Sequence, residues 1–165
     1  MPGLRANVCR SAALGNFHRL RWLANGIGDP MQSKSKPDQG VVAADAPRVL
    51  VVEDEFLIRM VVSDHLRDSG FIVLEAFNGD EAIDILKSGV LIDLIFTDVR
   101  MPGEVDGLGL LAYSILHRPD LPVVVTSGHL EPSLAYGGGA AQFLAKPCTL
   151  EAVAGTVMAA LKHAA

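Results

Sequence analysis

The sequence predicts an α/β protein built on a doubly wound, five-stranded parallel sheet. From Arg48 onward, short β-branched runs alternate with helical patterns, and such alternation is typical of a parallel sheet with helices on both faces. Several runs are apolar at nearly every position, as is usual for strands buried on both sides. The 165 residues, 50% of them hydrophobic, are sufficient for one domain of ordinary size and its core.

Five strands and four helices are predicted in order along the chain. We expect strands at 49–52, 71–74, 94–97, 123–126 and 142–145, and helices at 56–68, 80–87, 107–116 and 150–162. The helical segments carry apolar residues at i, i+3 and i+4 spacing. Asn78 and Thr149 are suitable N-caps for the second and last helices, and Gly70 follows the end of the first.

The connection between the fourth and fifth strands has a different composition. Residues 130–141 include Pro132 and three consecutive glycines at 137–139. Glycine and proline both disfavour a long helix. We therefore expect a short or mobile element in this crossover.

Residues 1–46 are predicted to be an N-terminal extension and flexible linker, which leaves residues 47–165 as the folded domain. Segment 28–46 is rich in Pro, Gly, Ser and charged residues and has no apolar period. Segment 12–24 carries apolar residues at helical spacing and is compatible with a short amphipathic helix. Met31 offers a second start, so residues 1–30 are also compatible with an upstream extension that is not translated.

Composition excludes several classes of protein. The net charge of −5 and the lack of a basic stripe argue against a nucleic-acid partner. No apolar run approaches the roughly 20 residues of a membrane span, so none is expected. Cys9 and Cys148 are too few and too far apart for a disulfide framework or a zinc site, which favours a cytoplasmic location.

Polar residues interrupt the chain where four of the predicted strands end. Glu53 and Asp54 follow the first strand, Asp98 follows the third, Thr126 ends the fourth, and Lys146 follows the fifth. The carboxyl ends of parallel strands and the loops after them form the ligand site of open α/β sheets. We therefore expect these side chains to meet in one pocket.

Three carboxylates brought together repel one another unless a cation lies among them. Mg²⁺, or Mn²⁺ in its place, suits such oxygen ligands. With the ion bound, one carboxylate is free to attack an electrophile. Phosphoryl transfer also needs the phosphoryl oxygens neutralised, a role that suits Lys146 and Thr126. The residues therefore indicate phosphorylation of an aspartate.

Four motifs, VLVVEDE, DVRMPG, VVVTSG and FLAKP in that order, resemble the response-regulator receiver domain of two-component signalling over about residues 47–164. The resemblance implies a flavodoxin-like receiver topology with strand order 2-1-3-4-5. It identifies Asp98 as the phosphoacceptor. It implies that Glu53, Asp54, Asp98 and the backbone carbonyl of Arg100 hold the metal.

The resemblance also assigns the remaining residues of the site. Thr126 and Lys146 match the hydroxyl and ammonium that bind the phosphoryl group. The bond between Lys146 and Pro147 is expected to be cis. Phe143 falls at the aromatic switch position.

The resemblance implies a response regulator, which we expect to stand alone because no effector domain follows residue 162. It would take its phosphoryl group from a histidine kinase or histidine phosphotransfer protein and signal through contacts with a downstream protein target. It is not expected to be an enzyme, apart from catalysing its own phosphorylation and dephosphorylation. The alternatives are a docking module that works without phosphorylation, and a phosphorelay intermediate or phosphate sink.

Two other classes of phosphate-handling protein fit the sequence less well. A haloacid-dehalogenase-type phosphatase would need an Asp-x-Asp pair after its first strand, where this chain has Glu53, Asp54 and Glu55. A flavodoxin-like FMN carrier would need a phosphate-binding loop at the same place, and the three acids there would repel the phosphate.

Overall fold

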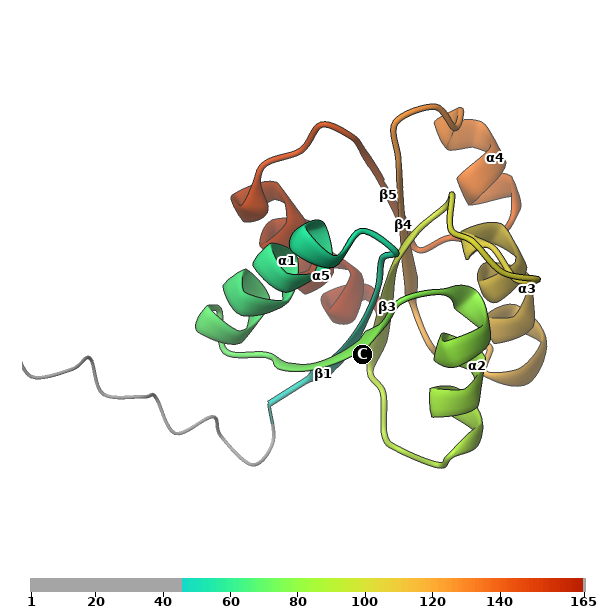
Figure 1. Ribbon diagram of the computed structural model, residues 1–165, viewed down its shortest axis with the longest axis horizontal. Helices are drawn as coiled ribbons and strands as arrows, with labels where there is room; N and C mark the ends of the chain where they lie inside the picture. Colours follow the sequence, from blue (N-terminus) through green and yellow to red (C-terminus); the bar gives the residue numbers. More distant parts are fainter. Residues whose placement is uncertain (1–45, 165) are drawn as a thin grey trace, which may run out of the picture. The chain divides into compact units, whose positions relative to one another are not determined.

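A computed structural model describes residues 46–164 (Figure 1). The predicted helix at 12–24, Cys9 and nearly all of the predicted linker lie outside the described residues. Strands and helices alternate through the described part. They are β1 (Arg48–Val52), α1 (Phe56–Asp68), β2 (Ile72–Ala76), α2 (Gly79–Lys87), β3 (Leu94–Asp98), α3 (Gly107–His117), β4 (Val123–Ser127), α4 (Pro132–Gly137), β5 (Gln142–Ala145) and α5 (Leu150–Ala164).

The five strands form one parallel sheet in the order β2-β1-β3-β4-β5. The predicted doubly wound architecture and strand order are therefore confirmed. Figure 1 shows α1 and α5 on one face of the sheet and α2, α3 and α4 on the other. Each face thus has its own layer of helices.

Alternate residues of β1 enter the two halves of the core. Val49 and Val51 pack into the cluster that contains residues of α1 and α5, such as Val157. Leu50 and Val52 pack into the cluster that contains residues of α2 and α3. These four residues of β1 are fully buried, because a strand directs successive side chains to opposite faces and this sheet is covered on both.

The predicted ends of the elements are largely correct. Asn78 Oδ1 accepts a hydrogen bond from Glu81 N at 2.8 Å, and Thr149 Oγ1 accepts one from Ala152 N at 3.2 Å, so both caps are confirmed. Gly70 has a φ of +92° just after α1, a left-handed conformation that glycine adopts without steric cost.

The structure corrects the bounds of the second predicted strand and defines the short element expected between the fourth and fifth strands. The second strand was predicted at 71–74, but β2 runs from Ile72 to Ala76. Phe71 N instead donates to Leu66 O at 3.1 Å and closes the turn after α1. The predicted short element between the fourth and fifth strands is α4, six residues long, with Pro132 at its start.

Within residues 46–164, no helix combines the length and apolar character needed to cross a membrane.

Candidate functional site

Three carboxylates meet at the carboxyl end of the sheet. Glu53 and Asp54 directly follow β1, and Asp98 ends the neighbouring strand β3. Each of the three offers an oxygen that lies within 4.8 Å of the other two. Glu53 is buried, Asp98 is half-buried and Asp54 is exposed. The pocket therefore has a buried wall and an open side, as a reacting site for an outside partner requires.

Lys146, which follows β5, bridges two of these acids. Its Nζ lies 2.7 Å from Glu53 Oε2 and 3.0 Å from Asp98 Oδ2. Its backbone N donates to Ser127 O at 3.0 Å, which extends the β4–β5 pairing up to the site. The peptide bond between Lys146 and Pro147 is cis, as predicted.

Burial and charge act differently on the two partners of this ion pair. Burial raises the pKa of the Glu53 carboxyl, since the contact with Lys146 offsets only part of that cost and the nearby Asp98 adds repulsion. Burial by itself would lower the pKa of the Lys146 ammonium. Its contacts with two carboxylates outweigh that effect and raise the pKa, so Lys146 carries a full charge at neutral pH.

Asp98 is held by its own backbone neighbours. Its Oδ1 accepts a hydrogen bond from Val99 N at 2.7 Å, and its carbonyl accepts one from Thr97 Oγ1 at 2.8 Å. In the parallel register, Asp98 pairs with Thr126 of β4. The phosphoacceptor candidate and the predicted hydroxyl are thus neighbours across two adjacent strands.

Thr126 has a buried hydroxyl that nothing in the described chain satisfies. The residue is 1% exposed, and its Oγ1 has no hydrogen-bond partner among residues 46–164. Buried polar atoms are nearly always paired in folded proteins. The hydroxyl next to Asp98 therefore has an unused hydrogen-bonding capacity within residues 46–164.

The sequence matches the response regulator receiver domain over residues 49–157. The chain belongs to this family. Receiver domains are signalling phosphoacceptors that bind Mg²⁺ at an acidic pocket. The grouping of Glu53, Asp54 and Asp98 fits that ion, because hard divalent cations prefer several carboxylate oxygens.

Curated relatives span several kinds of regulator. The sensor kinase CckA of Brucella abortus is 35% identical over 133 residues, which are 78% of this chain and 14% of that protein. The DNA-binding transcriptional regulator NtrC of Escherichia coli is 34% identical over 118 residues, 70% of this chain and 25% of that protein. The chain spans about half or less of the length of the relatives compared, including the uncharacterized transcriptional regulatory protein YcbL of Bacillus subtilis.

Solved receivers have the same fold. The receiver domain of NtrX from Brucella abortus superposes with a TM-score of 0.64 at 34% identity, covering 69% of this chain and 98% of that one. A response regulator receiver protein from Sinorhizobium medicae gives a TM-score of 0.68 at 30% identity, covering 73% and 98%.

Two further residues that the resemblance assigns to the site make no hydrogen bond or ion pair with the three carboxylates in the described part of the chain. Arg100 is exposed in the loop between β3 and α3. That loop is fastened to α2, because Glu104 N donates to Asp80 Oδ2 at 3.0 Å. Phe143, in β5, is half-buried against the core on the α2, α3 and α4 side. The predicted roles of Arg100 in metal binding and of Phe143 as a switch stay predictions.

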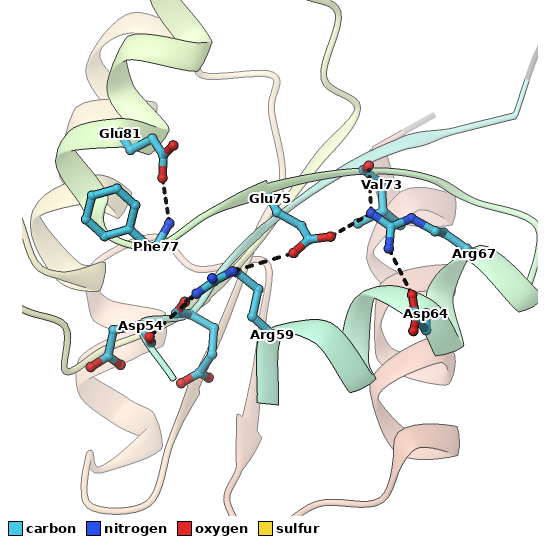
Figure 2. Close-up of polar contacts among 9 residues, drawn as sticks. Asp54, Arg59, Asp64, Arg67, Val73, Glu75, Phe77 and Glu81 are labelled. Atoms are coloured by element: carbon cyan, nitrogen blue, oxygen red, sulfur yellow. Dashed lines mark hydrogen bonds and ion pairs between the residues drawn. The ribbon is translucent and has the colours of Figure 1, made fainter. Parts of the chain in front are cut away.

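Sequence reasoning missed Arg59, which contacts the site from α1. Figure 2 shows its guanidinium reaching back toward the start of the helix, where Nη1 donates to Glu53 O at 2.6 Å. The available signal was weak: an arginine five residues after Asp54, in the second turn of a helix, is common on solvated helix faces. Only the direction of the Arg59 side chain in the folded structure distinguishes it from an ordinary surface arginine.

Proposed function

We propose that this receiver accepts a phosphoryl group on Asp98 from a phosphohistidine of a histidine kinase or histidine phosphotransfer protein. Glu53, Asp54, Asp98 and the backbone carbonyl of Arg100 would hold Mg²⁺. The observation that carries the proposal is the cluster itself: three carboxylates within 4.8 Å of one another, two of them in contact with Lys146.

The chemistry follows from the contacts of Asp98. A carboxylate oxygen attacks the phosphorus, the P–N bond of the donor breaks, and the imidazole nitrogen keeps the electron pair and takes up a proton. The Val99 N–H fixes one carboxylate oxygen and Lys146 contacts the other, so the nucleophile is oriented before the donor arrives. Mg²⁺, when bound, neutralises charge on the phosphoryl oxygens.

Lys146 and Thr126 would bind the transferred group. Lys146 keeps its charge and lies 3.0 Å from Asp98, so its ammonium can exchange that contact for a phosphoryl oxygen on the same side chain. The unpaired Thr126 hydroxyl can donate to another phosphoryl oxygen. The Thr126 hydroxyl gains its partner only after transfer, whereas Lys146 exchanges one oxygen partner for another, so the hydroxyl contact favours the phosphorylated state.

An apolar surface beside the site supports a protein donor. A cavity of about 700 Å³ between α1 and the β5–α5 connection is lined by Leu57, Val61, Lys146 and Pro147, among others. Leu57 is 61% exposed and Val61 is 45% exposed. Clustered exposed apolar residues mark interaction surfaces, and this one adjoins the lysine of the phosphorylation site.

We extend the proposal to the remainder of the predicted function. Residues 47–165 form the receiver, preceded by the 1–46 extension, and the phosphorylated protein acts in the cytoplasm through contacts with a downstream protein. A regulator without an attached effector domain stays a prediction, which the intact mass of the protein isolated from its natural source would test. A phosphate sink or relay intermediate would use the same site.

The decisive experiment is intact mass spectrometry after incubation with acetyl phosphate, with and without Mg²⁺. We expect a Mg²⁺-dependent gain of one phosphoryl group in the wild type and none in Asp98→Asn. Glu55→Gln is the matched control, because it removes an exposed neighbouring acid that has no part in the cluster.

Glu55→Gln should therefore be phosphorylated like the wild type. Folded wild-type protein that gains no mass under any of these conditions would refute the proposal. That result would favour the alternative of a docking module that works without phosphorylation.

A further inference from the structure

One side chain of α1 forms hydrogen bonds to the loop that carries Glu53 and Asp54, two of the three clustered acids. We define the acidic loop as residues 53–55, between β1 and α1. Arg59 Nη1 donates to Glu53 O at 2.6 Å and lies 3.5 Å from Asp54 O. The Arg59 side chain is only 14% exposed. The contact is therefore a partly buried, charge-assisted hydrogen bond to the backbone that presents the acids.

Besides the ion pair between Lys146 and Glu53 and the helical hydrogen bond from Arg59 N to Glu55 O at 2.9 Å, the acidic loop has few other constraints. Glu53 N pairs with Ala76 O at 3.2 Å, which continues the β1–β2 ladder by one residue. Beyond that point, the N-cap of α1 is Glu55, whose side chain makes no capping hydrogen bond. No residue in the range 46–164 donates a hydrogen bond to the Asp54 carboxylate. The position of this exposed carboxylate therefore depends on the backbone that Arg59 holds.

Arg59 is itself oriented by a chain of charges, drawn in Figure 2. Its Nε lies 3.5 Å from Glu75 Oε2 of β2, and the other oxygen of Glu75 contacts Arg67 Nη2 at 2.6 Å. Arg67 also pairs with Asp64 at 3.0 Å. Arg59 and Arg67 thus share Glu75, but only Arg59 reaches the acidic loop.

We propose that Arg59 is a positioning residue for the metal site: it holds the acidic loop so that Glu53 and Asp54 converge with Asp98 on one divalent cation. The inference rests on the proposed function, because it takes these carboxylates to be metal ligands. Partners that orient the ligands of a metal typically account for 10- to 100-fold in affinity.

Positioning and simple electrostatics predict opposite results. A guanidinium close to a cation site repels the cation, so loss of its charge alone would strengthen Mg²⁺ binding. Loss of a positioning contact would weaken it. The sign of the change therefore distinguishes the two roles.

The test is a Mg²⁺ titration of the full chain, followed by the backbone amide NMR signals of Glu53 and Asp98. We expect Arg59→Gln to bind Mg²⁺ about tenfold more weakly than the wild type. The matched control is Arg67→Gln, which also removes a Glu75 ion pair but touches neither loop carbonyl. It should bind Mg²⁺ like the wild type.

Arg59→Lys covers the case in which the glutamine variant does not fold. It keeps the charge but loses the rigid fork in which Nη1 contacts Glu53 O while Nε faces Glu75, so we expect affinity below that of the wild type. Wild-type or tighter binding in the folded Arg59 variants would overturn the inference, as would an equal loss in Arg67→Gln. Failure of the wild type to bind Mg²⁺ would instead overturn the proposed function and, with it, this inference.

Discussion

Gly107 is the position where one methyl group should most directly displace the phosphoacceptor. It is the first residue of α3, and its N–H donates to Val99 O at 2.9 Å. A Cβ at this position would overlap the backbone carbonyl oxygen of Asp98. It would also lie 2.8 Å from Val99 Cα. The Gly107→Ala substitution therefore forces the start of α3 away from the end of β3.

The size of the shift follows from ordinary contact distances. Non-bonded carbon atoms prefer roughly 3.5–4.0 Å, so the contact with Val99 Cα alone requires the two segments to separate by about 1 Å, and the overlap with the Asp98 oxygen requires at least as much. Overpacking of this kind typically costs about 1–3 kcal/mol of the free energy of unfolding. A misplacement of about 1 Å in a reacting group can lower the rate about 100-fold. We expect both effects in Gly107→Ala.

The assay is the initial rate of phosphorylation by acetyl phosphate with Mg²⁺, measured by intact mass, together with urea unfolding. Gly155→Ala is the matched control, because a Cβ at that exposed position of α5 meets no atom within 4 Å. It should keep the wild-type rate and gain up to about 1 kcal/mol in stability. A wild-type rate and an unchanged urea midpoint in Gly107→Ala would refute the steric reasoning.

Three further predictions concern other parts of the receiver. Ser114 Oγ is buried without a hydrogen-bond partner in residues 46–164, so Ser114→Ala should raise the free energy of unfolding by roughly 1 kcal/mol in urea; a less stable variant would contradict this. Burial raises the pKa of Glu53, so its ionisation destabilises the metal-free fold. In EDTA, the wild type should lose stability relative to Glu53→Gln as pH rises through that raised pKa. Urea unfolding should therefore show a more stable variant at neutral pH and no difference in acid, where Glu53 is protonated. Leu57→Asp and Val61→Asp should slow phosphotransfer from a phosphohistidine protein but not from acetyl phosphate, because only the protein donor needs the apolar surface; equal slowing with both donors would count against that surface.

Strand β2 shows where sequence patterns lose precision. The predicted strand, 71–74, ended before Glu75. In the structure, β2 is the edge strand next to β1, and Glu75 lies within it, directed at Arg59 and Arg67. A half-buried edge strand tolerates a charged residue that has ion-pair partners. The partners of Glu75 lie on α1, so the pattern within the strand does not reveal them.

The candidate site was more predictable than its internal contacts. Strand ends, helix caps and the approach of Glu53, Asp54, Asp98 and Lys146 follow from local patterns and parallel topology. The pairing of Lys146 with Glu53, across 93 positions of sequence, could not be read from either segment. It depends on the directions of both side chains at the site, which only the packed sheet defines.

The sequence by itself determined the α/β class, the order of the elements, and the edge of the sheet at which the acids, the hydroxyl and the lysine gather. These properties arise from periodicity, turn chemistry and chain connectivity, all of which are local. The tertiary structure decided which charges pair, that the Thr126 hydroxyl has no partner among residues 46–164, and that Arg59 turns back to the acidic loop. Those outcomes depend on distances of a few ångströms between segments that are remote in sequence, which packing alone sets.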